Sequence, residues 1–308
     1  MTNFIIIFLC FILGVLLKNV QRFPRSSSLT INLFIIYISL PALILNKFPP
    51  LLKSLKLTGL WWVPISMAWI TFILSWILIS HLGRKLNWSR AKTGALILTA
   101  GLGNTSFVGF PLLEAILGKE AIPIGILADQ PGSFLIVSSL GILVAAKYSG
   151  EEANAKFILK KVFTFPPFLA LLSSILWTLI GNPGTVLFNE AFEKISITLV
   201  PLALFSVGFQ TDFNLNVIKK RIKPLLIGIC FKLILIPCLF FFLYHSVLGV
   251  SGEYLQVTIL ESAMATQITS AVVASEFFLD AELANLMVGL TIPLSLLSVP
   301  LFNWLFFN

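Results

Sequence analysis

Charged residues are scarce in this sequence: Lys, Arg, Asp and Glu together make up 11% of the 308 residues. A soluble domain usually has about a quarter of its residues charged and fewer than half apolar. Here 57% of the residues are hydrophobic and the mean hydropathy is +0.98. A chain of this composition cannot enclose its apolar residues behind a polar surface, so we expect it to lie in a lipid bilayer.

Residues that carry catalytic or metal chemistry are also few. The two histidines, His81 and His245, are far apart, and the sequence has neither an HExxH nor a GxSxG pattern. The three cysteines lie within apolar runs and lack the spacing of a metal site or a disulfide framework. We therefore expect a protein that is not an enzyme and that binds no metal or other cofactor, apart from a coupling ion.

Apolar runs of about 20 residues, the length needed to cross a bilayer, recur ten times with short connections between them. The first run begins at Asn3 with no basic residue before it and no cleavage site after it, which predicts a retained helix and not a signal peptide. We predict an all-α polytopic membrane protein with spans at 3–20, 28–47, 60–81, 92–117, 121–146, 161–181, 187–210, 224–246, 254–279 and 282–307.

Short clusters of Lys and Arg between the apolar runs predict the orientation, and their dispersal argues against nucleic acid binding. Connections 1–2, 3–4, 5–6 and 7–8 contain 15 Lys and Arg residues, whereas the other side contains 5. The positive-inside rule therefore places both termini on the outer side of the plasma (inner) membrane and the central loop in the cytoplasm. Lys47, Lys53 and Lys56 are exceptions to this pattern.

The two halves of the chain resemble each other when the sequence is shifted by 162 residues. Because each half has five spans, an odd number, the two copies must have opposite orientations in the membrane. Inverted repeats of this kind are typical of secondary transporters, whose substrate site lies at the repeat interface. The predicted units are a first repeat (1–146), a cytoplasmic linker (147–160) and a second repeat (161–308). The pairs that support them are Glu114 with Glu276, Glu120 with Glu282, Pro131 with Pro293 and Ser133 with Ser295.

The fourth span of each half contains polar and small residues that lipid cannot satisfy: TAGLGNTSFVGFPLLEAILG at 99–118 and ESAMATQITSAVVASEF at 261–277. Non-helical backbone at this depth is tolerated only where it is buried in protein or lines a cavity. Pro111 lacks a donor and disfavours helix at Phe110. We predict helix breaks near Gly103–Phe110 and Met264–Ser270, whose free N–H and carbonyl groups form a binding site.

The segments GNTSFVGFPLL, ADQPGSFL, LVPLALFSVGFQ and ELANLMVGLTIPLSLLSVPL, in this order, resemble the auxin efflux carrier family. This resemblance covers most of the chain. It implies a scaffold of spans 1, 2, 6 and 7, and a mobile transport domain of spans 3–5 and 8–10 that works by an elevator mechanism. It also implies crossing broken helices and, as in the plant auxin exporters, a homodimer. The chain departs from the family at Met264-Ala265, where the family usually has Met-Pro.

Ionisable residues within predicted spans are costly unless they are paired or hydrated, so they indicate function. Asp129 and Gln130 match the family motif. Glu261 and Gln267 resemble a sodium-site segment of the distantly related bile-acid symporters, and such oxygen ligands suit Na⁺, while a glutamate equally suits a proton. Lys232 either snorkels toward the cytoplasm or partners a carboxylate or an anionic substrate.

The predicted site therefore has two sets of residues and one charge partner, Lys232. The substrate-binding residues are Asn104, Thr105, Ser106, Gly109, Pro111, Asp129, Gln130, Met264 and Thr266. The cation-coupling residues are Glu261, Gln267, Asn104 and Thr105.

These observations predict a secondary transporter for a small organic anion, such as a carboxylate or an auxin-like weak acid, with Na⁺ or H⁺ as the coupling ion. An uncoupled uniporter and an anion channel of the same fold are the alternatives. A carrier saturates and exchanges substrate, whereas a channel usually assembles its pore from repeated subunits. The sequence leaves open the substrate, the coupling ion and the direction of transport.

Overall fold

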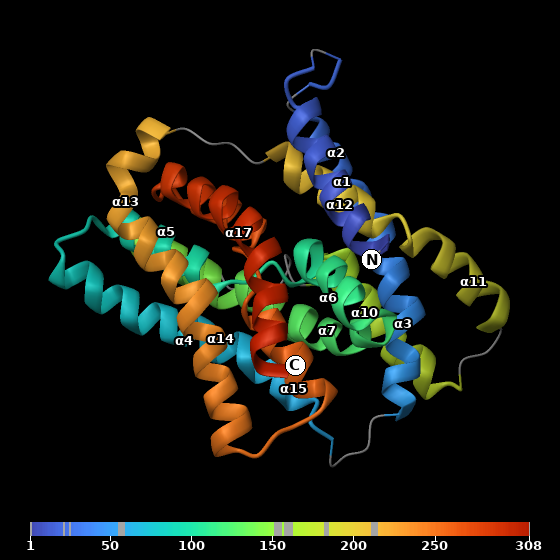
Figure 1. Cartoon of the computed structure of the whole chain (residues 1–308). Helices are drawn as coiled ribbons and strands as arrows, with labels where there is room; N and C mark the ends of the chain where they lie inside the picture. Colours follow the sequence, from blue (N-terminus) through green and yellow to red (C-terminus); the bar gives the residue numbers. More distant parts are fainter. Residues whose placement is uncertain are drawn as a thin grey trace.

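A computed structural model of the chain shows an all-helical protein (Figure 1). The structure describes residues 2–20, 22–24, 26–54, 59–150, 156, 163–181, 185–210 and 215–307. Most of the predicted linker 147–160 therefore lies outside the described residues. The helices of the first half are α1 (Thr2–Leu17), α2 (Ser27–Phe34), η1 (Ile35–Ser39), α3 (Leu40–Ser54), α4 (Trp62–Lys85), α5 (Arg90–Gly101), η2 (Thr105–Gly109), α6 (Phe110–Leu117), η3 (Lys119–Ala121), α7 (Ile122–Ala128), η4 (Asp129–Phe134), η5 (Val137–Gly141) and α8 (Ile142–Ser149).

The second half also contains both long and interrupted helices. Its helices are α10 (Pro166–Leu179), α11 (Thr185–Ser196), α12 (Leu199–Gln210), α13 (Leu215–Cys230), η6 (Phe231–Leu235), α14 (Ile236–Phe240), η7 (Phe241–Val247), α15 (Glu253–Ser262), α16 (Ile268–Glu276) and α17 (Ala281–Phe307).

Six helical stretches in the described parts of the chain are long and apolar enough to cross a membrane, which supports a multi-pass membrane protein. The ten-span inverted repeat stays a prediction, because α1 and α10 have only 16 and 14 residues and the predicted fourth and ninth spans are each divided into shorter helices. The six stretches are Ser27–Pro50, Trp62–Lys85, Lys119–Ser149, Phe188–Phe209, Ile218–Val247 and Ala281–Phe307.

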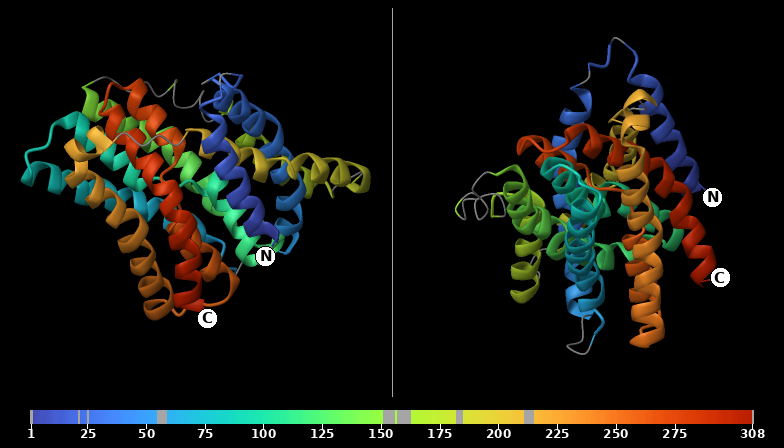
Figure 2. Two further views of the ribbon diagram at one scale, coloured as in Figure 1. Left: turned by 45° about the horizontal axis from the view of Figure 1, so that its top comes forward. Right: turned by 90° about the vertical axis from the view of Figure 1, so that its left-hand side faces the viewer.

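The predicted span 187–210 differs from a single straight helix. A turn at Ile197 and Thr198 separates α11 from α12, and the Thr198 hydroxyl donates to the Ile195 carbonyl at 2.6 Å. Pro201 has no N–H group to donate to the carbonyl of residue 197, which explains why the helix is interrupted here. As a result, α11 projects away from the body of the protein in Figure 2.

The helices pack in two groups. In one group α1 and α2 contact α12, while α3 contacts α10 and α11; in the other, α4 and α5 contact each other, α15 contacts α4, and α8 and α17 contact α5. The crossing of α1 and α12 is close, because a Cβ atom at Gly208 would lie 2.1 Å from the Phe11 carbonyl oxygen. Small residues allow this approach between helices in membranes. The first group consists of the predicted spans 1, 2, 6 and 7, although its role as a scaffold stays a prediction.

The two groups meet where the short helices of the fourth and fifth predicted spans contact the first group. There α7 packs against α3, and η2 packs against α12. Both views of Figure 2 show the two chain termini toward the same face of the molecule.

Candidate functional site

The helices of the fourth and ninth predicted spans are interrupted, but the first interruption lies earlier than predicted. Helix α5 ends at Gly101, Leu102 is extended (φ −114°, ψ 126°), and helical structure resumes at Thr105 in η2. The prediction that Pro111 breaks the helix at Phe110 is wrong, because Phe110 is helical (φ −58°, ψ −45°). Pro111 instead lies in the first turn of α6, where its missing N–H group costs little. The second interruption, residues 263–267, separates α15 from α16.

The two interruptions cross and pair with each other. Gly103 and Thr266 form an antiparallel bridge: the Asn104 N–H group donates to the Ala265 carbonyl at 2.7 Å, and the Gln267 N–H group donates to the Leu102 carbonyl at 3.1 Å. The bridge pairs Gly103 with Thr266, one position away from Ala265, the residue that the shift of 162 pairs with Gly103. Each break thus satisfies part of the backbone of the other, as buried non-helical backbone requires.

Threonine hydroxyl groups fix the second break without the proline that the family usually has there. The Thr266 hydroxyl donates to the Thr99 carbonyl of α5 at 2.8 Å, and the Thr266 N–H group donates to the Thr291 hydroxyl of α17 at 2.9 Å. Met264 is fully buried within this break. These bonds connect α5, the second break and α17.

Asn104 and Gln267 lie at the crossing and each has a free polar atom. The Asn104 Oδ1 atom accepts from the Phe107 N–H group at 3.1 Å and so caps η2. The Asn104 Nδ2 atom and the Gln267 Oε1 atom are buried without a hydrogen-bond partner among the residues the structure describes. Both side chains therefore retain hydrogen-bonding capacity for a ligand.

Asp129 is a buried carboxyl group whose two oxygen atoms are both satisfied. The Thr105 hydroxyl donates to Oδ1 at 2.5 Å and the Gln130 amide donates to Oδ2 at 2.5 Å, while Ser106 lies beside the same carboxyl group. Asp129 begins η4, which is kinked at Gly132 (φ −95°, ψ −106°). Asp129 therefore orients η2 instead of offering a free ligand.

Glu261 is in the opposite situation. Its side chain is 1% exposed, and neither carboxyl oxygen has a hydrogen-bond partner within the described part of the chain. Two glycines provide the space for it: a Cβ atom at Gly109 would lie 2.7 Å from Oε2, and one at Gly125 would lie 3.2 Å from Oε1. Burying an unpartnered ionised carboxylate costs several kcal/mol, so this group requires a cation or a proton.

A small cavity of about 10 Å³ lies between α4, the first break and α15. That volume holds roughly one water molecule or one ion. Thr105, Lys232 and Glu261 line it, together with Thr71 and Ser133. Asn104 and Gln267, which we predicted as cation ligands, do not line it.

Lys232 is 2% exposed and does not snorkel to the surface. Lys232 lies on the π-helical segment η6. Its Nζ atom lies 3.0 Å from the position that a Cβ atom of Gly103 would occupy. Both Lys232 and Glu261 are described, yet no ion pair of 4.0 Å or less joins them. The two charges thus share a cavity without contact.

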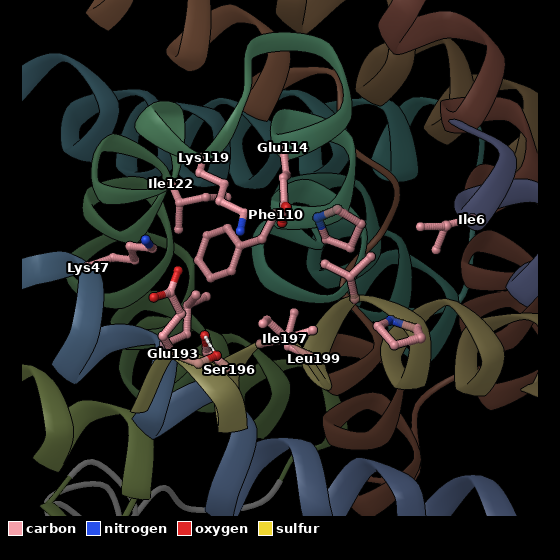
Figure 3. Close-up of a pocket in the computed structure, with 14 residues that line it drawn as sticks. Ile6, Lys47, Phe110, Glu114, Lys119, Ile122, Glu193, Ser196, Ile197 and Leu199 are labelled. Carbon is pink, nitrogen blue, oxygen red and sulfur yellow. Dashed lines mark hydrogen bonds between the residues drawn. The ribbon is translucent and has the colours of Figure 1, made fainter. Parts of the chain in front are cut away.

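A larger cavity of about 350 Å³ is lined by residues of several helices, including α3, α6, α11 and α12 (Figure 3). Phe110, Pro111 and Ile122 from the second helix group face Leu199 and Pro201 from the first, so most of its wall is apolar. Its charged groups are Lys47, Glu114, Lys119 and Glu193. In Figure 3 the side-chain ends of Lys47 and Glu193 point toward one another from α3 and α11. The volume is within the range of small-molecule sites.

The sequence analysis did not identify three residues of the small site. Thr71 on α4 and Ser133 on η4 line the cavity, and Gly125 makes room for the carboxyl group. Ser133 had a weak signal, since it pairs with Ser295 in the shifted sequence. Gly125 and Thr71 lie in ordinary apolar helices, and only the packing of α7 and α4 around Glu261 distinguishes them.

Comparison with known proteins is consistent with this architecture. The chain matches the family described as membrane transport protein over residues 1–303. It is 28% identical over 295 residues to an uncharacterized transporter of Methanothermobacter thermautotrophicus, a match that covers 95% of this chain and 93% of that protein. It is 26% identical over 286 residues to an uncharacterized transporter of Methanocaldococcus jannaschii, covering 90% and 89% of the two chains.

The resemblance to auxin efflux carriers is thereby confirmed, because this family is the one that the whole chain matches. The chain belongs to the membrane transport protein family, whose members are transporters and not enzymes.

Proposed function

We propose that this protein is a secondary transporter for a small organic anion, a carboxylate or an auxin-like weak acid, and that it carries one cation, Na⁺ or H⁺, with each substrate. The observation that carries the proposal is Glu261, a buried carboxyl group with two unpartnered oxygen atoms beside a cavity of the size of one ion.

The charges around the small cavity support a single cation. Asp129, Glu261 and Lys232 are all buried, and if all three are ionised their sum is one negative charge. Uncompensated charge at membrane depth is costly. One monovalent cation or one proton restores neutrality, whereas two would leave an excess positive charge. This balance favours a stoichiometry of one.

The same short segment, Thr105 to Pro111, separates the small cavity from the larger one. Thr105 and Gly109 face Glu261, while Phe110 and Pro111 line the larger cavity. We place the organic anion in the larger cavity, its apolar part against Phe110 and Leu199 and its charged group near Lys119 and Lys47. A cation at Glu261 then orders the wall against which the substrate binds, which couples the two sites.

An elevator movement of the second helix group against the first is the transport step in this proposal. The larger cavity lies between the two helix groups. Of its charged lining residues, Lys47 and Glu193 belong to the first group, whereas Glu114 and Lys119 belong to the second. A sliding of the groups therefore changes which charges face the substrate. We also propose that the protein forms a homodimer in the plasma membrane with both termini outside.

Substrate flux into proteoliposomes tests the cation site. In a screen of carboxylates, uptake should saturate and should depend on Na⁺ or on pH. If Na⁺ couples, Glu261→Gln abolishes the sodium dependence; if H⁺ couples, the same change mimics the protonated carrier and removes the pH dependence. The matched control is Glu253→Gln at the exposed start of the same helix, which should keep wild-type coupling.

An uncoupled uniporter is the second candidate, because Lys232 lines the cavity that Glu261 lines. A small movement of Lys232 would neutralise Glu261 without any external cation. This alternative holds if wild-type uptake depends on neither Na⁺ nor pH, and the proposal of cation coupling then fails. Flux that does not saturate and shows no exchange would instead indicate a channel.

A further inference from the structure

A third cavity, of about 610 Å³, opens at the ends of α4, α5 and α8, on the side that the basic clusters predict to be cytoplasmic. It is open to the surface and separate from both cavities of the transport site. Its lining includes three cationic side chains, Arg84, Arg90 and Lys147, and three aromatic ones, Trp76, Trp88 and Tyr148. The proposed transport function uses none of these residues.

The charge of this basic pocket is of one sign. Among the described residues that line it, none is acidic. Arg90 donates a hydrogen bond to the Lys147 carbonyl, which ties the start of α5 to α8. The Arg84 side chain makes no hydrogen bond or ion pair with another described residue. Three clustered cations without a carboxylate partner among the residues that the structure describes favour a ligand with a phosphate group.

The base of the pocket is closely packed. A Cβ atom at Gly83 would lie 2.5 Å from the Thr93 hydroxyl, and one at Gly94 would lie 2.6 Å from the Tyr148 Cβ atom. The Ser80 and Tyr148 hydroxyl groups are 2.6 Å apart and join α4 to α8. The cations are therefore mounted on three helices whose spacing is fixed, which limits the reorganisation that binding would require.

The pocket continues into an apolar surface that faces lipid. Ile77, which lines it, is 59% exposed, and Ile73, one turn earlier on the same face of α4, is 43% exposed. The Lys147 Nζ atom lies 5.3 Å from the centre of the Trp76 ring. Tryptophan is typical of the headgroup region of a bilayer. The ligand must therefore be anionic at one end and apolar at the other.

We propose that this pocket binds the phosphate headgroup of an anionic phospholipid, with an acyl chain along Ile73 and Ile77. The inference does not depend on the transported substrate or on cation coupling. Further along the same helices, α4 lines the small cavity and α5 ends at the first break. A lipid in the basic pocket would therefore stabilise the helix pair that supports the transport site.

Native mass spectrometry of the full chain in detergent tests the proposal with phosphatidylglycerol, with zwitterionic phosphatidylcholine as the comparison lipid. The wild type should retain phosphatidylglycerol in preference. Near a membrane surface each cation contributes about a fivefold change in affinity, so the triple variant Arg84→Gln, Arg90→Gln, Lys147→Gln should lose roughly a hundredfold. The matched control neutralises three exposed cations of α13, Lys219, Lys220 and Lys223, and should lose less than fivefold.

Three results would overturn the proposal. The first is an equal loss in the two triple variants, which would mean general electrostatic attraction. The second is equal retention of the two lipids by the wild type. The third is that inorganic phosphate is retained as strongly as phosphatidylglycerol, with the same dependence on the three residues. That result would assign the pocket to a soluble phosphate compound. If the triple variant fails to fold, the single change Arg84→Gln should still lower phosphatidylglycerol affinity about fivefold, and Arg84→Lys should keep it.

Discussion

Replacing Gly109 by alanine tests whether Glu261 occupies a space that only glycine leaves. The new Cβ atom would lie 2.7 Å and 2.9 Å from the two Glu261 carboxyl oxygens, and the carboxyl group would have to move by roughly 1 Å to regain normal van der Waals separation. Gly125 borders the same carboxyl group, because a Cβ atom built there would lie 3.2 Å from Oε1, so the shift moves Glu261 within a space that two glycines leave open. Since binding groups must be held within about 0.5 Å, we expect the cation affinity to fall roughly 10- to 100-fold.

The cost in stability should be much smaller than this loss of function. The atoms that must shift are the end of one side chain, so the overpacking cost should be at the low end, about 1 kcal/mol. The measurement is the cation concentration, Na⁺ or H⁺, that gives half-maximal substrate uptake in proteoliposomes, together with the thermal unfolding temperature in detergent.

Two further variants make the Gly109→Ala result interpretable. Gly141→Ala is the matched control, because its Cβ would lie 3.3 Å from the Ile136 carbonyl and 3.7 Å from a Leu98 methyl group, with no ionisable side chain among these neighbours. Its cation requirement should equal that of the wild type. Adding Glu261→Asp to Gly109→Ala removes one methylene and should restore part of the affinity. An unchanged cation requirement in Gly109→Ala, or no restoration in the double variant, would refute the assigned position of the carboxyl group.

Other changes test the rest of the site and the helix packing. Thr105→Val removes the 2.5 Å hydrogen bond to Asp129; a bond to a charged group is worth about 1.5–3 kcal/mol, so transport should fall at least tenfold while Thr105→Ser keeps it. Gly208→Ala places a Cβ atom 2.1 Å from the Phe11 carbonyl oxygen and should lower stability by about 3 kcal/mol, measured by thermal unfolding, because two backbones and not a flexible side chain must separate. Lys119→Gln should raise the KM for an anionic substrate about tenfold and change the maximal rate less, and an unchanged KM would remove Lys119 from the proposed site.

The sequence predicted that the fourth and ninth spans are interrupted because polar and small residues at membrane depth need a reason to be there. It did not predict the correct first break. Proline at position 111 suggested a break at Phe110, but a proline in the first turn of a helix is tolerated, and the preceding π-helical turn at η2 accommodates it. The break instead lies at Leu102, where the non-helical segment around Thr266 supplies the hydrogen bonds. Such long-range pairing has no local signal.

The same distinction explains which site residues could be found. The sequence singles out Asp129, Lys232 and Glu261 as candidates because a charge in an apolar run is conspicuous, and the structure shows that all three are buried. Their roles could not be found in the same way, because whether a carboxyl group is satisfied depends on neighbours more than twenty positions away, such as Thr105 for Asp129. Sequence similarity identified the family across the whole chain, yet it left open which glycines make space for Glu261.

The contrast between the two buried carboxyl groups decides which of them is suited to a transported ion. A ligand that is already bound to two donors, as Asp129 is, must lose hydrogen bonds before it can bind a cation, and the cost of that exchange opposes binding. Glu261 has no such bonds to lose, and its burial makes the unoccupied ionised state unfavourable. In the proposed mechanism the cation therefore binds at Glu261, while Asp129 holds Thr105, and with it the segment between the two cavities, in place.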